Sequence, residues 1–257
     1  MSFPIPNRKI QKLFSKVMNI PPQLYGVLFG HQNYDRFAII GYARTGSNYV
    51  AGGINSSRSV HMFHEIFAAH NRELGKNFDK IMSKLYRKQE KRIRNVGFKL
   101  FYYHLTENEW KKFLSFKDFS IIHLTRRNHL RTLVSLEIAF KTNRWTSGNS
   151  KLSLESRIVY LDPDKLLKDI EKIIKYENIT RDRFRDRKMM EVVYEDVVKD
   201  PINQFTQIGN FLGITDIDHQ KIHIRKQNPE VLKNLIENFD EVSYSLKNTR
   251  FAEYLTS

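Results

Sequence analysis

The chain has 257 residues, of which 40% are hydrophobic and 28% are charged, and this composition excludes a disordered protein and indicates a globular one. Basic side chains number 43 and acidic side chains 28, so the formal charge is +15. A surplus of this size favours an anionic partner, such as a nucleotide, a nucleic acid, an acidic glycan or a membrane surface. Because there is no cysteine, disulfides, thiolate metal sites and thiol nucleophiles are excluded.

The first residues, MSFPIPNRKIQKLFSK, contain no secretory leader, and no apolar run reaches the roughly 18 residues that a membrane-spanning helix needs. We therefore expect a cytoplasmic protein that forms one domain over residues 1–257. Residues 1–35 are predicted to be a helical extension with an apolar face that includes Leu13 and Val17. This face is expected to pack on the domain or to make a peripheral contact with a membrane surface.

Four short apolar runs predict buried strands, at Phe37–Gly41, Val96–Leu100, Ser120–Leu124 and Glu191–Tyr194. Segments with helical spacing lie between them, at Ser47–Asn55, Asn71–Arg92, Glu107–Phe116, Leu130–Thr142 and Leu161–Arg183. This alternation predicts an α/β fold, a P-loop-like parallel sheet with helices on both faces (an α/β/α sandwich). Because such sheets bind ligands at the carboxyl ends of their strands, we expect the functional residues directly after each strand.

The loop after the first predicted strand has the spacing of a phosphate-binding loop. Gly41 and Gly46 are five residues apart, as in the Walker loop, but Ser47 occupies the position of the Walker lysine. Backbone N–H groups at a helix N-terminus bind phosphate without that lysine, and Arg44 supplies a positive charge. The side chains that can add hydrogen bonds are Thr45, Ser47 and Asn48. The alternative is a glycine-rich turn with no ligand.

A second anion site is predicted after the strand Ser120–Leu124. A nucleotide hydrolase would carry a magnesium-binding aspartate there, whereas this chain has Arg126 and Arg127, which repel a metal and attract a phosphate. Ser135 follows eight residues after Arg127, about two helical turns away. Two anion sites without a metal-binding carboxylate favour a nucleotide with phosphates at two separate positions over ATP with magnesium, so we expect no metal.

In this order the motifs resemble the sulfotransferase superfamily, whose donor is 3′-phosphoadenosine-5′-phosphosulfate (PAPS). GYARTGSNY resembles its 5′-phosphosulfate loop, RRNHLRTLVS its 3′-phosphate motif, and VVYEDVVKDPINQFTQIGNFLGI the strand and helix that follow. IRKQNP resembles the late basic loop over the nucleotide. The resemblance extends from Phe37 to Pro229 and is nearest to bacterial carbohydrate, glycolipid and nodulation-type sulfotransferases. The chain departs from the family at Ala43, where proline is common, and at Gly52 and Gly53, where bulkier residues are usual.

The resemblance implies roles in donor binding. Arg44 is expected to contact the sulfuryl group and to stabilise the leaving phosphate. The residues expected at the 5′-phosphate are Arg44, Thr45, Gly46, Ser47 and Asn48. Those expected at the 3′-phosphate are Arg127 and Ser135, assisted by Arg225 and Lys226. Tyr194, at the predicted end of a strand, is expected near the adenine.

The resemblance also places an acidic catalytic base after the short apolar segment Val60–Phe63, which makes Glu65 the candidate. His64 is the rival base, and the alternative for Glu65 is a carboxylate that interacts with a helix dipole. Lys99 ends a predicted strand, from which it reaches either the substrate and sulfuryl group or the solvent. These are the expected catalytic residues: Glu65, Arg44 and Lys99.

The predicted reaction is therefore a metal-free, in-line transfer of the sulfuryl group of PAPS to a hydroxyl of a carbohydrate or glycolipid. The acceptor pocket is expected near His104, Trp145 and Asn143–Ser153, because an aromatic and polar lining suits a sugar. One alternative is a P-loop kinase-like enzyme, which the missing Walker lysine disfavours. Another is a basic nucleic-acid-binding protein, but its basic residues would form a continuous face, so we expect no nucleic-acid partner.

Overall fold

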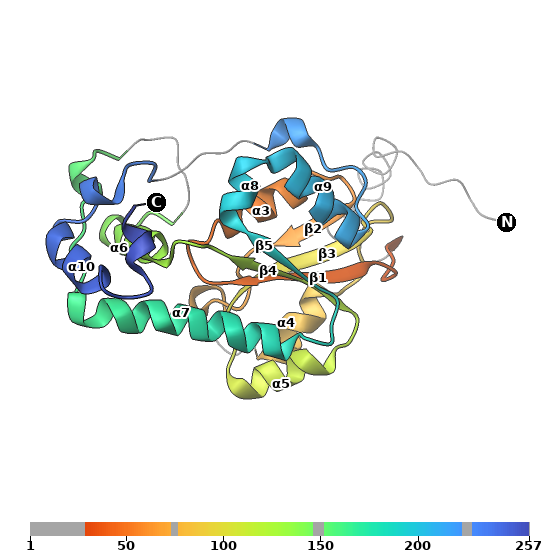
Figure 1. Cartoon of the computed structure of the whole chain (residues 1–257). Coiled ribbons are helices and arrows are strands. Elements are labelled where there is room, and N and C mark those ends of the chain that lie inside the picture. The colour runs from red at the N-terminus through yellow and green to blue at the C-terminus, as the bar shows by residue number, and fades with distance from the viewer. Residues whose placement is uncertain (1–28, 73–76, 146–151, 223–227, 257) are drawn as a thin grey trace.

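The computed structural model describes residues 29–72, 77–145, 152–222 and 228–256. They form a five-stranded sheet in the order β2-β3-β1-β4-β5, in which every pair of neighbours is parallel. The strands are β1 (Asp35–Gly41), β2 (Val60–Phe63), β3 (Asn95–Phe101), β4 (Phe119–Thr125) and β5 (Met189–Val193). Helices cover both faces of the sheet (Figure 1). The predicted α/β fold is therefore confirmed.

The central strand β1 shows how the sequence builds a core on each face. Successive side chains of a strand point to opposite faces, so Ala38 and Ile40 join one apolar cluster and Phe37 and Ile39 join the other. The first cluster is covered by α4 (Phe78–Leu85) and α5 (Glu107–Ser115). The second is covered by α3 (Ser47–Ile54), α8 (Tyr194–Lys199) and α9 (Pro201–Leu212).

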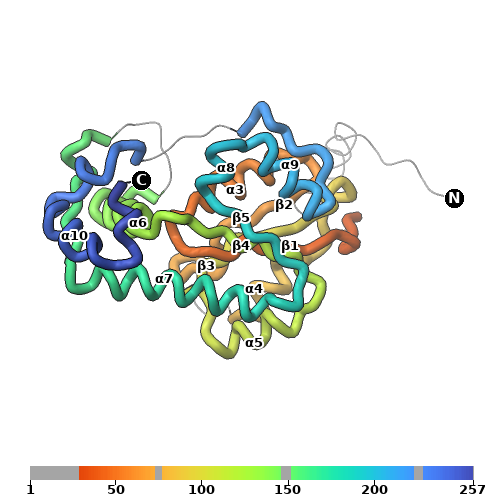
Figure 2. Tube along the Cα trace, viewed as in Figure 1, coloured from red at the N-terminus to blue at the C-terminus, as the bar shows by residue number. Residues whose placement is uncertain are grey.

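A third group of helices meets beside the carboxyl end of the sheet, and one of its members continues from there along the face that α4 and α5 cover (Figure 1). It consists of α6 (His129–Thr142), α7 (Pro163–Arg183) and α10 (Phe239–Leu246). Its apolar cluster includes Leu130, Ile170 and Val242, one from each helix. Figure 2 shows the C-terminal part of the chain folded beside α6 and α7. The 3₁₀ turns are η1 (Ala69–Asn71), η2 (Glu155–Arg157), η3 (His219–Lys221), η4 (Leu232–Asn234) and η5 (Ala252–Leu255).

The predicted helix over Asn71–Arg92 is wrong in extent, because α4 occupies only Phe78–Leu85. After α4, Gln89 forms an antiparallel bridge with His31, with N···O distances of 3.0 and 2.8 Å in the two directions. This bridge holds the chain in a non-helical conformation. A pairing between residues so far apart has no signature in local hydrophobic periodicity.

The predicted strand Glu191–Tyr194 is also shifted. β5 spans Met189–Val193, so Tyr194 is not the end of a strand but the first residue of α8. The apolar segment Val60–Phe63 is an edge strand, β2, paired with β3.

Most of the predicted N-terminal extension, residues 1–28, lies outside the described residues. Within the described ranges, none of the helices combines the length and the apolar character needed to cross a membrane.

Candidate active site

A cavity of about 1740 Å³ lies at the carboxyl ends of the strands. Its walls come from the segments that follow β1, β2, β3 and β4 and from α6 and α8. The predicted site residues that line it are Arg44, Gly46, Ser47, Asn48, Glu65, Lys99, Arg127, Ser135 and Tyr194. A single small-molecule site usually occupies roughly 300–1,000 Å³, so this cavity has room for two substrates.

The loop after β1 presents an open helix N-terminus. Gly46, the N-cap of α3, has φ 86° and offers no side chain to cap the helix, and the first turn of α3 contains no acidic residue. A Cβ at Gly46 would lie 2.2 Å from the ring of Tyr194, so only glycine fits. The Tyr49 N–H donates to the Gly46 carbonyl at 2.9 Å, so the N–H groups that this N-terminus offers to an anion are those that precede Tyr49.

Thr45 differs from its neighbours in this loop. Its side chain is buried, and its hydroxyl donates to the carbonyl of Tyr42 at 2.8 Å. The hydroxyl thus stabilises the turn, and only the backbone of Thr45 remains for a ligand.

Arg44 joins the loop to α6. Its backbone is left-handed, with φ 68°, a conformation that few residues other than glycine adopt. Its Nε donates to Ser135 Oγ at 3.0 Å and its Nη1 to the Trp145 carbonyl at 2.7 Å, and its own carbonyl accepts from Arg126 Nη1 at 3.2 Å. Burial, and then the charge of Arg126, lower the pKa of Arg44. An anion in the cavity would offset both effects.

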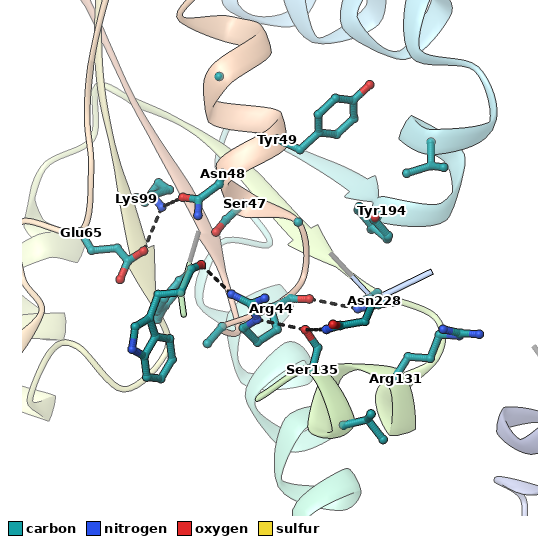
Figure 3. A pocket seen from close by; sticks show the side chains of 18 of the residues that line it. Arg44, Ser47, Asn48, Tyr49, Glu65, Lys99, Arg131, Ser135, Tyr194 and Asn228 are labelled. Carbon is teal, nitrogen blue, oxygen red and sulfur yellow. Dashed lines mark hydrogen bonds and ion pairs between the residues drawn. The ribbon is translucent and has the colours of Figure 1, made fainter. Parts of the chain in front are cut away.

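Glu65, Lys99 and Asn48 meet at one point, as Figure 3 shows. Lys99 is 1% exposed, its Nζ lies 2.9 Å from Glu65 Oε1, and it also donates to Asn48 Oδ1. Lys99 therefore does not extend into solvent, which removes one alternative. Glu65 is 25% exposed and is followed by the 3₁₀ turn Ala69–Asn71 rather than by an α-helix. Among the described residues no α-helix begins at Glu65, so its carboxylate does not cap a helix of its own. The rival base His64 lies exposed in the cavity wall.

The second predicted anion site contains a buried serine and a paired arginine. Ser135 Oγ accepts from Arg44 Nε and from Asn228 Nδ2, the latter at 3.3 Å, so its own O–H can donate to a ligand. The Arg127 guanidinium donates from Nη1 and Nη2 to the two carboxylate oxygens of Asp196, at 2.8 and 2.7 Å. Arg225 and Lys226, predicted to assist here, lie outside the described residues.

The sequence matches the sulfotransferase domain family over residues 34–239, which is most of the chain. The chain belongs to this family. It is therefore an enzyme of the sulfotransferase class.

Solved structures of sulfotransferases are also similar to this chain. A sulfotransferase from Alicyclobacillus acidocaldarius is 15% identical with a TM-score of 0.46, and the match covers 86% of this chain and 92% of that one. A mouse sulfotransferase complexed with PAP is 17% identical with a TM-score of 0.46, covering 90% of each chain. The sulfotransferase domain of a Synechococcus olefin synthase is 18% identical with a TM-score of 0.41, covering 78% and 82%. A comparison with curated protein sequences gives no match.

Exposed aromatic side chains also line the cavity of the sulfotransferase. Tyr103, Phe140 and Trp145 are 48%, 61% and 41% exposed, and all three line the cavity. The rings of Phe140 and Trp145 meet edge to face, with their centroids 5.1 Å apart. Of the predicted acceptor segment Asn143–Ser153, residues 146–151 lie outside the described ranges.

His104 also lines the cavity, next to Tyr103. Its Nδ1 is 3.2 Å from the backbone N–H of Phe101, which is a donor, so Nδ1 accepts and the neutral ring carries its proton on Nε2. Burial lowers the pKa of His104 to about 4, so the ring is neutral at pH 7. His104 thus has a hydrogen-bond donor, its Nε2–H, besides its contact with Phe101.

The structure adds residues that the sequence did not single out. Arg131, Asn228, Tyr49, Tyr103 and Phe140 also line the cavity of the sulfotransferase. Arg131 could have been predicted from its spacing. It lies four residues from both Arg127 and Ser135, so it falls on one helical face with Ser135. The aromatic residues carry no motif. Among the described residues, no group of three or more His, Asp or Glu side chains is placed to hold a metal ion.

Proposed function

We propose that this enzyme transfers the sulfuryl group of PAPS to a hydroxyl of a carbohydrate or glycolipid acceptor. The observation that carries this proposal is the contact between the Glu65 carboxylate and the Lys99 ammonium, beside Asn48 on the first turn of α3. Glu65 can accept a hydroxyl proton, and Lys99 can bind the transferred anionic group. The two side chains lie next to the proposed phosphate-binding loop. A general base for the hydroxyl proton and a cation for the developing negative charge are the two contributions that accelerate sulfuryl transfer to an alcohol.

In the proposed reaction, the acceptor oxygen forms a bond to sulfur while the bond between sulfur and the 5′-phosphate oxygen breaks. Glu65 takes the proton of the attacking hydroxyl as general base. Arg44 and Lys99 stabilise the negative charge that develops on the leaving phosphate and on the sulfuryl oxygens. The products are a sulfate ester and adenosine 3′,5′-bisphosphate (PAP).

The same proposal assigns the donor's phosphates. The backbone from Thr45 to Asn48 and the hydroxyl of Ser47 bind the 5′-phosphate, because α3 presents an uncapped N-terminus there. Arg127 and Ser135 bind the 3′-phosphate, and Tyr194 packs near the adenine. The assistance of Arg225 and Lys226 remains a proposal from the sequence alone.

The exposed aromatic residues support a sugar as acceptor. A sugar ring has an apolar face that packs on aromatic side chains such as Tyr103, Phe140 and Trp145, and hydroxyl groups at its edge. His104 supplies a donor for one of these hydroxyl groups, and Glu65 accepts the proton of the reacting one.

Calorimetric titration of the purified protein tests the donor assignment. In excess chelator, we expect micromolar binding of PAP and much weaker binding of adenosine 5′-phosphate, which lacks the 3′-phosphate. Tighter binding of ATP that requires magnesium would contradict the proposal and favour a kinase-like enzyme. Binding of a polynucleotide with a steep salt dependence, and of none of the small nucleotides, would indicate a nucleic-acid-binding protein instead.

A further inference from the structure

We propose that Arg131 is a further ligand of the donor's 3′-phosphate and determines the selection of nucleotides that carry it. The inference rests on the proposed function, and it adds a residue to the pair Arg127 and Ser135. Four observations support it: the place of Arg131 on α6, the state of Arg127, the surroundings of Arg131, and the hydrogen-bond donors around Ser135.

The place of Arg131 follows from helical geometry. It lies four residues before Ser135 within α6, so the two side chains share one face of the helix. Both line the cavity, and Figure 3 shows them on successive turns, with Asn228 beside Ser135. An anion that contacts Ser135 is therefore one helical turn, about 5.4 Å, from the level of Arg131.

Arg127 is already engaged by a carboxylate. Both of its terminal nitrogens donate to Asp196, and its backbone N–H donates to Glu195 at 3.0 Å. Its side chain is 58% exposed. A phosphate would have to compete with Asp196 for the same bidentate guanidinium face. Because Arg127 is paired with Asp196, we do not expect Arg127 alone to account for selection of the 3′-phosphate.

Arg131 has different surroundings. It is half-buried, and its Nη1 donates to the backbone carbonyl of Glu230 at 3.1 Å. The carboxylate of Glu230 is itself paired with Arg157, at 2.6 Å. A guanidinium has five N–H donors, so the contact with the Glu230 carbonyl is compatible with binding an anion as well. Burial lowers the pKa of Arg131, although Tyr194, Glu195 and Glu230 oppose this effect. A bound phosphate would offset the desolvation of its charge.

The donors around Ser135 match a phosphate monoester, which has three terminal oxygens. Ser135 can donate its O–H, since its oxygen already accepts from Arg44 and Asn228. Asn228 has a second amide hydrogen beyond the one that it gives to Ser135. Arg131 adds a charged donor from the adjacent turn, so the site would bind the phosphate through three different side chains.

The test compares nucleotides that differ only in one phosphate. Wild type, Arg131→Gln and Arg131→Lys are titrated with PAP, with its isomer adenosine 2′,5′-bisphosphate, and with adenosine 5′-phosphate. We expect Arg131→Gln to bind PAP about tenfold to a hundredfold more weakly, the usual effect of losing a charged hydrogen bond. Its affinity for adenosine 5′-phosphate should change by less than about twofold, which also shows that the variant is folded. Arg131→Lys keeps the charge and should retain most of the preference for PAP.

Lys141→Gln is the matched control. Lys141 lies on the same helix, donates to the Ile158 carbonyl and is absent from the cavity lining, so this variant removes one positive charge from α6 without changing a lining residue. Its affinities should equal those of wild type.

Two results would overturn the inference. An Arg131→Gln variant that binds PAP as wild type does would show that Arg131 does not contact the phosphate. An equal loss for PAP and adenosine 5′-phosphate would show that Arg131 only holds the segment at Glu230. A wild type that does not prefer PAP over adenosine 5′-phosphate would instead contradict the proposed function itself.

Discussion

At the scale of single residues, His123 is the most deeply buried titratable group on the sheet, with 0% of its side chain exposed. Its Nδ1 lies 3.3 Å from Glu191 Oε1 and its Nε2 lies 2.7 Å from the Tyr102 hydroxyl. A carboxylate only accepts, so Nδ1 carries the proton and Tyr102 donates to Nε2. Burial lowers the pKa of His123 to about 4, and the ring is therefore neutral in the folded protein at pH 7.

This burial predicts sensitivity to acid. His123 has a pKa near 6.5 when unfolded and about 4 when folded, so between these values the unfolded chain binds more protons. Stability contributed by the neutral ring is thus present above about pH 6.5 and is lost as the pH falls toward 4. At pH 5 the loss from this residue should be about 2 kcal/mol.

Urea unfolding at pH 7.5 and pH 5 measures this loss, with His123→Gln as the comparison. Between the two pH values, the free energy of unfolding of the variant should fall by about 2 kcal/mol less than that of wild type. Glu177, whose pKa burial raises to about 7, acts with the opposite sign, but it is present in both proteins and cancels in the comparison. Identical losses in wild type and His123→Gln would contradict the prediction.

The sequence predicted the kinds of residue in the site better than their contacts. Glu65 and Lys99 were each expected to take part in catalysis, and the structure brings them to 2.9 Å. The pairing of Arg127 with Asp196 was not predictable from spacing. Asp196 follows β5, and its proximity to Arg127, which follows β4, depends on the pairing of those two strands.

At the scale of elements, α3 contains two adjacent glycines that occupy different surroundings. A Cβ at Gly53 would lie 2.2 Å from the ring of Phe205 on α9, whereas a Cβ at Gly52 would have nothing within 4 Å. The departure from the family at Gly53 therefore permits close packing of two helices. The packing gives no reason for the departure from the family at Gly52.

These surroundings predict opposite effects of two neighbouring substitutions. Gly52→Ala should raise the free energy of unfolding by about 1 kcal/mol, the difference in helix propensity. Gly53→Ala should lower it by roughly 1–3 kcal/mol, since the methyl group must displace Phe205 in a packed core. Chemical denaturation of the two variants gives both values. A similar shift for both would contradict the packing of α3 on α9.

Local sequence patterns predicted most of the buried strands and several of the helices. Apolar runs identified the buried strands, and the 3.6-residue period identified α3, α5, α6 and α7 within one or two residues at each end. The long predicted helix over Asn71–Arg92 is wrong at its C-terminal end, where Gln89 pairs with His31 instead of continuing α4. Such a tertiary contact is invisible to periodicity.

At the scale of the whole molecule, strand order assembles the site. β1 lies between β3 and β4, so the carboxyl ends of these three strands are side by side. Arg44 follows β1, Lys99 lies near the end of β3, and Arg126 follows β4, and the three cations therefore line one cavity. The order of the strands was not predicted from the sequence. The site residues could therefore be identified, but not which of them lie next to one another. Part of the excess positive charge thus lies inside a cleft.

The most direct test of the account is sulfuryl transfer by wild type and Glu65→Gln. Radiolabelled PAPS is incubated with a panel of glycosides and glycolipids in excess chelator, and the labelled sulfate ester is quantified. We predict transfer by wild type and a loss of roughly 10²-fold or more in turnover for Glu65→Gln, the scale of a lost general base. The affinity of the variant for PAP should be nearly unchanged. Equal turnover by the two proteins, or transfer that depends on added magnesium, would contradict the account.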